Sequence, residues 1–211
     1  MAIKEKLKKL KDRIKREAKV ITADETKDRI FSSRKKFSSE ETAQEAFETS
    51  KQRLFNINAW TEIPALLNSK FHLHLPNGER TNKKEPMIGE FISIQLPVPS
   101  PLNWVRIVDI KDEENFAEFT VSPSEDPSDQ ENPEKIAHFF HNFTSSTFKV
   151  ELKGNTLYAY EIGKNEAVNS KGPEAGKRGL VNIALAEGGW LGFQKIQWKN
   201  LTDYLVNKAH K

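Results

Sequence analysis

The sequence predicts an α+β fold: a curved antiparallel β-sheet of about six strands, with a long C-terminal helix packed across it and a basic helix at the N-terminus. Between residues 71 and 162, segments of alternating polarity follow one another across turn-rich connections, which is typical of an antiparallel sheet. Between residues 193 and 208, apolar residues cover a broad helical arc that a sheet would bury. The length of 211 residues fits one domain, residues 21–211, with an appendage at residues 1–20.

The appendage is predicted to be a basic amphipathic helix. Ile3, Leu7, Leu10 and Ile14 lie on one narrow stripe, and nine Lys or Arg face three acids, which gives residues 1–20 a charge of +6. Because the whole chain carries +3, the remaining residues carry −3. Such a helix can lie on an anionic membrane surface, pair with a partner helix or pack on its own domain. The acidic balance of the remainder argues against nucleic-acid binding.

A short strand and two helices are predicted between the appendage and the sheet. The strand falls within residues 29–37. Ser38 stands three residues before Glu41, the spacing of a capping box, so a helix is expected from there to about residue 55. Its buried side would carry Ala43, Ala46, Phe47, Ser50 and Leu54. A second short helix over residues 60–67 contains Pro64, which implies a kink or a new start.

The sheet strands are predicted over residues 71–75, 91–96, 103–110, 116–121, 147–152 and 157–162. Lys153, Gly154 and Asn155 form a tight connection between the last two. In residues 103–110, Trp104, Arg106, Val108 and Ile110 are expected on one face. Residues 122–134 read as an acidic loop and 163–179 as a glycine-containing connection before a helical region interrupted at Gly188 and Gly189.

No catalytic motif is present, so whether the protein is an enzyme stays open. The chain has no cysteine, which excludes disulfides and thiolate chemistry, and no cofactor is expected. His138 and His141 share one face of an expected short helix, and with His72 or His74 they could bind a metal ion. Glu161 and Glu166 are expected at a solvated surface. Without a signal peptide or a run of 18 apolar residues, the location is predicted to be cytoplasmic.

The order of elements resembles the START-like helix-grip superfamily, the SRPBCC type. Its first strand, two short helices, antiparallel strands and long C-terminal helix correspond to residues 30–37, 39–67, 71–162 and 193–208. The stretch from Trp60 to Pro64, followed by Gly89 to Ile94, looks like the region after the first helix of such proteins. The interrupted C-terminal helical region and the acidic loop depart from that pattern and leave another α+β fold open. The resemblance implies a cavity between sheet and helix that holds an apolar molecule.

The leading hypothesis is therefore a protein that binds a small apolar or amphipathic molecule under the C-terminal helix. The expected cavity is lined by apolar and aromatic strand residues, with Arg106 at a polar end of the ligand: Ile92, Ile94, Trp104, Val108, Phe148 and Tyr158. One alternative is an interaction module that docks through residues 1–20 on a membrane or a partner helix. A further alternative is a metal-dependent enzyme that uses the histidines.

Overall fold

The structure is a computed structural model that describes residues 27–64, 68–97, 102–129, 144–166 and 190–208. Its described elements are, in chain order, β1 (Lys27–Lys36), α2 (Glu40–Phe55), the 3₁₀ helix η1 (Ile57–Glu62), β2 (Lys70–His74), β3 (Phe91–Gln95), β4 (Asn103–Asp112), β5 (Phe116–Pro123), β6 (Ser145–Lys153), β7 (Thr156–Glu166) and α4 (Trp190–Leu205). The α+β prediction is confirmed. The predicted helix over residues 1–20 and the histidines His138 and His141 lie outside the described residues.

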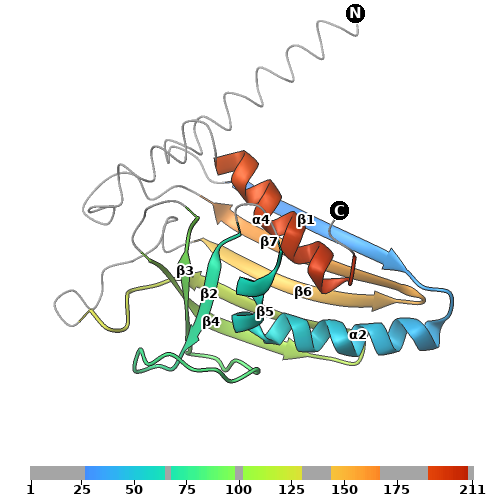
Figure 1. Cartoon of the computed structure of the whole chain (residues 1–211), viewed down its shortest axis with the longest axis horizontal. Helices are drawn as coiled ribbons and strands as arrows, with labels where there is room; N and C mark the ends of the chain where they lie inside the picture. The colour runs from blue at the N-terminus through green and yellow to red at the C-terminus, as the bar shows by residue number, and fades with distance from the viewer. Residues whose placement is uncertain (1–26, 65–67, 98–101, 130–143, 167–189, 209–211) are drawn as a thin grey trace, which may run out of the picture.

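All seven described strands form one antiparallel sheet in the order β1-β7-β6-β5-β4-β3-β2. Strands β2 to β7 follow one another as neighbours, and the first strand joins the far edge beside the last. Figure 1 shows β2 and β3 running steeply across the direction of β6 and β7, so the sheet is strongly twisted. Helices α2 and α4 lie on one face of it (Figure 1), which we call the helix-facing side; the other is the outer face.

Helix α2 begins one residue later than the predicted capping box of Ser38 and Glu41 implies. Ser39 is the N-cap, and its hydroxyl accepts the backbone N–H of Thr42 at 3.2 Å. The cap therefore satisfies one of the amide groups that every helix start leaves open. Ala43, Phe47 and Leu54 are buried as predicted, and Ser50 donates its hydroxyl to the carbonyl of Leu205 at 2.8 Å. One side of α2 thus packs on the sheet and touches the end of α4.

The second predicted helix is displaced. A 3₁₀ turn spans Ile57–Glu62, and the backbone is extended at Ile63, next to Pro64. A proline ring clashes with a helical residue before it, so the helix ends ahead of Pro64 and does not run through it. Trp60 is fixed in the core by this turn, where its indole N–H donates to the carbonyl of Arg53 at 2.9 Å.

Helix α4 lies over β1 and β7 (Figure 1). Leu201 and Leu205 are buried against the sheet, as the sequence predicts, and Tyr204 is partly buried. Ile196 was expected in the same apolar arc but is 39% exposed. The buried side of α4 is therefore narrower than the sequence pattern indicates. None of the helices in the described part of the chain is long and apolar enough to cross a membrane.

A bulge in β4 changes which side chains face the helices. Between Ile107 and Asp109 the register with β5 shifts by one residue. Ile110 consequently lies opposite Phe119 and packs with the core, whereas Trp104 and Arg106 remain on the outer face. Strict alternation had put these three residues on one face, and the extra residue of the bulge explains why that prediction was wrong.

Candidate functional site

The layer between the sheet and the helices is built around five aromatic side chains. Trp60 meets Phe71, Phe119 and Phe148 at ring-centroid distances of 5.6, 5.9 and 5.1 Å. Phe148 also meets Trp198 of α4 at 5.5 Å with the rings at 66°. These are the edge-to-face and offset distances at which aromatic pairs stabilise one another. The middle of this layer is therefore filled by side chains, and the predicted cavity cannot lie there.

Beside this aromatic cluster, a carboxylate is buried on the helix-facing side. Glu161 lies between Phe148 on β6 and Phe31 on β1 in the sheet register, and its exposed fraction is 0%. The expectation of a solvated Glu161 was wrong. The alternation in β7 contained the signal, because Glu161 shares its face with Leu157 and Ala159. A charged group on an apolar face costs free energy to bury and often marks a functional position.

The next row of the sheet has two small residues beside an arginine. Ser146 on β6 pairs with Gly163 on β7, and Gly163 pairs with Arg29 on β1. Gly163 lies two residues after Glu161 on β7, so this row is further from the buried Leu157 than the row of Glu161 is. The helix-facing side thus combines aromatic rings, a buried carboxylate, two small residues and the half-buried Arg29 within two rows.

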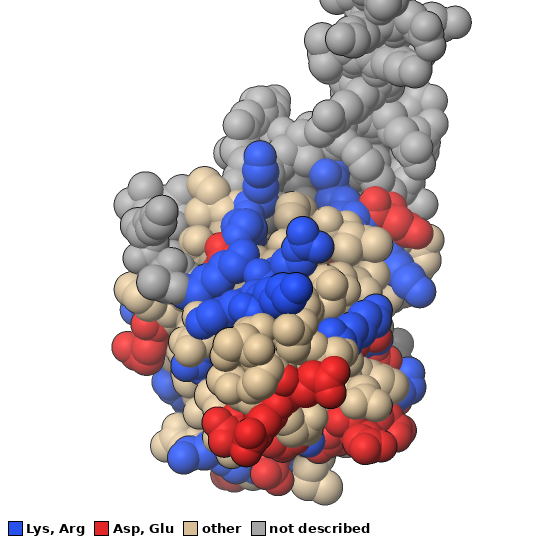
Figure 2. Space-filling model, turned by 90° about the vertical axis from the view of Figure 1, so that its right-hand side faces the viewer, with Lys and Arg blue, Asp and Glu red and all other residues tan. Residues whose placement is uncertain are grey.

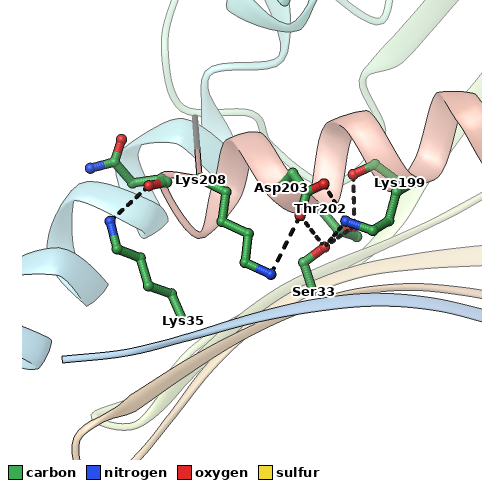
Figure 3. Close-up of polar contacts among 7 residues, drawn as sticks. Ser33, Lys35, Lys199, Thr202, Asp203 and Lys208 are labelled. Atoms are coloured by element: carbon green, nitrogen blue, oxygen red, sulfur yellow. Dashed lines mark hydrogen bonds and ion pairs between the residues drawn. The ribbon is translucent and has the colours of Figure 1, made fainter. Parts of the chain in front are cut away.

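A polar cluster holds α4 on the edge strand β1 at the other end of this layer (Figure 3). The Ser33 hydroxyl donates to Asp203 Oδ1 at 2.7 Å and meets the Thr202 hydroxyl at 2.9 Å. Lys199 forms an ion pair with Asp203, and its Nζ lies 3.3 Å from Ser33 Oγ. Lys208 reaches Asp203 at 3.8 Å. We call Ser33, Lys199, Thr202, Asp203 and Lys208 the α4 clamp.

The electrostatics of the α4 clamp indicate anchoring more than catalysis. Burial acts to raise the pKa of Asp203, but hydrogen bonds from Lys199 and Ser33 and the charges of Lys199 and Lys208 outweigh it and lower the pKa. Lys199 is paired as an ammonium, so it has no free lone pair with which to take the Ser33 proton. Ser33 already gives that proton to Asp203. The cluster ties helix to strand with charge-assisted hydrogen bonds.

The predicted ligand contacts are divided between the two faces of the sheet. Ile92, Ile94 and Phe148 lie on the helix-facing side, where they belong to the core or pack against it. Trp104, Arg106 and Tyr158 lie on the outer face, and Val108 is 45% exposed at the bulge. One cavity cannot hold both sets because the sheet itself separates them. The prediction that Arg106 anchors a ligand under α4 was therefore wrong.

On the outer face, Trp104 joins a histidine cluster over β2, β3 and β4. His74 Nδ1 donates to the Gly78 carbonyl at 2.9 Å, its Nε2 shares a hydrogen bond with Ser93 Oγ at 2.9 Å, and its ring meets Trp104 edge-on at 4.7 Å. Burial lowers the pKa of His72, and the positive charge of Arg80 adds to the effect. The described residues contain no group of three His, Asp or Glu arranged to hold a metal ion.

An open groove of about 650 Å³ runs along the C-terminal half of α2. Its charged lining is balanced, with three cations and three carboxylates: Lys51, Arg53, Lys84, Glu48, Glu85 and Asp112. Lys51 donates to Asp112 at 3.1 Å and pairs with Glu48 at 3.2 Å, so these charges are already used within the protein. The groove opens at the surface and is not the predicted space between sheet and α4.

No protein-family model matches the chain, and neither does any curated protein sequence. Among solved structures, the hypothetical protein jhp0584 from Helicobacter pylori is 11% identical, with a TM-score of 0.53 over 90% of this chain and 92% of that one. Norcoclaurine synthase from Thalictrum flavum, in complex with dopamine and hydroxybenzaldehyde, is 9% identical, with a TM-score of 0.43 over 90% of this chain and 94% of that one. Ginseng major latex-like protein 151 from Panax ginseng is 17% identical, with a TM-score of 0.32 over 75% of this chain and 94% of that one.

The likeness to the Helicobacter pylori protein shows a shared fold. At TM-scores below 0.5, the other two likenesses say nothing about the function of this chain. The arrangement of elements itself is the one that the START-like resemblance implies: a first strand, two short helices, an antiparallel meander and a C-terminal helix across the sheet.

Proposed function

We propose that this protein binds a small apolar or amphipathic molecule between the sheet and α4, above the rows that contain Glu161 and Gly163. The observation that carries the proposal is the complete burial of Glu161 on the helix-facing side. The ligand's apolar part would lie against the aromatic rings of Phe148 and Trp198. Its polar end would lie toward Glu161.

The position of α4 supports this placement. The α4 clamp and the buried Leu201 and Leu205 fix the C-terminal part of the helix on β1 and β7. Trp198 stands one turn further toward the helix start and covers Phe148. A ligand needs open space beside apolar side chains, with a few polar groups that orient it. Ser146 and Gly163 supply the smallest floor on this side of β6 and β7.

Binding is favoured over catalysis by the chemistry of the described residues. A nucleophile needs a base within hydrogen-bond reach, and the base must be free to accept a proton. In the α4 clamp the serine donates to a carboxylate whose pKa is lowered and which is held by two lysines. A single buried carboxylate can orient a ligand without any second catalytic group.

The test combines native mass spectrometry with a matched pair of variants of the full chain. Freshly purified protein is compared under native and denaturing conditions, together with Glu161→Gln and Glu151→Gln. Glu151 is the control because it lies on the outer face between Lys149 and Lys153. We expect an extra mass in the native protein and in Glu151→Gln that leaves on denaturation, and much less of it in Glu161→Gln.

If the natural ligand is lost during purification, a titration can still detect the site. The full chain is titrated with two amphipathic probes of opposite charge, dodecylamine and dodecanoate, and binding is monitored by tryptophan fluorescence. At least one should give a saturable change that Glu161→Gln weakens about tenfold, the effect of losing one good polar contact. The proposal fails if no mass is carried and neither probe saturates, or if Glu161→Gln binds as well as the control variant.

A further inference from the structure

One end of the molecule carries a concentration of positive charge. It is formed by the end of β1, the β6–β7 hairpin, the C-terminal half of α4 and the turn that follows α4. Six cations meet three carboxylates there, a net charge of +3: Arg34, Lys35, Lys36, Lys153, Lys199 and Lys208 against Glu40, Glu151 and Asp203. Figure 2 looks onto this end and shows Lys and Arg gathered over its upper half, with Asp and Glu below. We call these six cations the basic end.

Several of these cations have partners within the protein. Lys199 and Lys208 pair with Asp203, and Lys153 Nζ lies 2.7 Å from Glu151. Lys35 donates to the carbonyl of Asn207 at 2.8 Å (Figure 3). Surface pairs of this kind are weak and leave the net charge unchanged. The basic end therefore keeps a positive field that attracts an anionic partner.

Arg34 and Lys36 are the cations of the basic end most open to such a partner. Both are exposed on the outer face of β1, and neither forms an ion pair with another described residue. In the sheet register Arg34 lies opposite Tyr158, and Lys36 lies opposite Thr156 at the hairpin. A change at these two positions removes positive charge without breaking a contact that holds the fold.

Two tyrosines beside Arg34 distinguish between the anionic partners. The rings of Tyr158 and Tyr160 stack on each other, with centroids 6.2 Å apart and planes 5° apart, and Lys153 lies 5.7 Å from the centroid of Tyr158. Single-stranded nucleic acids need free aromatic faces on which bases can stack. Here the ring faces are already partly occupied. Tyrosine beside lysine is, in contrast, a typical composition at the headgroup level of a membrane.

We propose that the basic end docks on an anionic membrane surface. Five of its six cations are lysines, whose flexible ammonium groups suit the diffuse charge of lipid headgroups more than the bidentate recognition in which arginine excels. Residues 1–20 carry nine cations and three acids along an amphipathic pattern, so the sequence supplies a second segment of the same chemistry ahead of β1. The proposal is independent of the ligand under α4.

The test is co-sedimentation of the full chain with two kinds of vesicle. One kind is phosphatidylcholine alone, and the other contains about 30% phosphatidylserine. Arg34→Glu combined with Lys36→Glu removes the two exposed cations. Lys70→Glu with Lys84→Glu is the matched control, because both lysines are exposed and lie on β2 or in the loop after it, at the opposite edge of the sheet. Both double variants change the net charge equally.

We expect binding to phosphatidylserine vesicles only, and a loss of at least about 30-fold in the first double variant, because two surface cations are lost and two carboxylates are added. The control should lose less than about threefold. Wild-type binding should also fall steeply with salt, a measurement that does not depend on how any variant folds.

Three results would overturn the proposal. Equal losses in both double variants would mean that net charge alone is sensed. Unchanged binding in the first double variant would assign docking to residues 1–20 alone. Binding to single-stranded polyuridylate that depends on Arg34 and Lys36, without vesicle binding, would assign the basic end to RNA.

Discussion

Phe148→Ala tests whether the aromatic cluster is the main support of the layer between sheet and helices. Phe148 is 4% exposed and meets Trp60, Phe119 and Trp198 at 5.1, 5.2 and 5.5 Å. Phe→Ala in a core costs about 3–5 kcal/mol, because the removed ring leaves a cavity. Each lost aromatic pair contributes about 0.5–1.5 kcal/mol of that value. Since three pairs are lost at once, we expect the upper half of the range, about 4–5 kcal/mol.

The assay is urea unfolding followed by circular dichroism, with the free energy of unfolding extrapolated to water. Phe116→Ala is the matched control, because Phe116 is only half-buried on the outer face, where Lys149 lies 4.5 Å from its ring centroid. It should cost less than about 2 kcal/mol, with little cavity left behind. If Phe148→Ala costs no more than Phe116→Ala, the layer is loosely packed and the description of the cluster as the central support is wrong.

Three further predictions concern the α4 clamp, the outer face and a turn. Asp203→Asn should destabilise the protein by about 1–2 kcal/mol at neutral pH. Folding lowers the pKa of Asp203, so the ionised carboxylate stabilises the protein above its ordinary pKa of 3.8, and this stabilisation is lost as the pH falls through the lower pKa of the folded state. The difference in unfolding free energy between Asp203→Asn and the wild type should therefore shrink below about pH 4. A difference that stays constant with pH would contradict this. Trp104→Phe should cost less than about 1 kcal/mol although Trp104 is only 3% exposed, because its buried indole N–H has no partner among the described residues. A larger cost than for Trp60→Phe, which loses a hydrogen bond to a carbonyl, would show that this N–H binds something. Gly78→Ala should cost about 1–2 kcal/mol from its φ of +85° alone, since the new methyl would meet Pro127 at an ordinary 3.5 Å; unchanged thermal stability would contradict that strain.

Local rules predicted much of the fold. The serine ahead of α2, the alternation in six strands and the glycine turn between β6 and β7 each depend on a few neighbouring residues. Sequence reasoning can assess such features because their physics is local. The first strand was expected as a short segment, and it spans Lys27–Lys36 because it pairs along most of β7.

The candidate site was predicted less well, for two physical reasons. The bulge in β4 reversed the face of Ile110 relative to Trp104, and a bulge leaves little trace in the pattern of polarity. Glu161 was expected at the solvated surface because carboxylates are usually exposed. Its neighbours Leu157 and Ala159 in alternation pointed to the buried side, and giving their pattern more weight than residue type would have found it.

The position of β1 has a consequence for how the chain folds. Residues near the N-terminus pair with residues about 130 positions later: Lys36 with Thr156 at one end and Lys27 with Glu166 at the other. During synthesis this first strand has no partner until residues 156–166 have left the ribosome. Closing so long a loop is entropically costly, so docking of β1 and α4 should be the last and slowest step. Until then β7 presents an open edge, and a chain stalled at that point would be the form most exposed to aggregation and to chaperones.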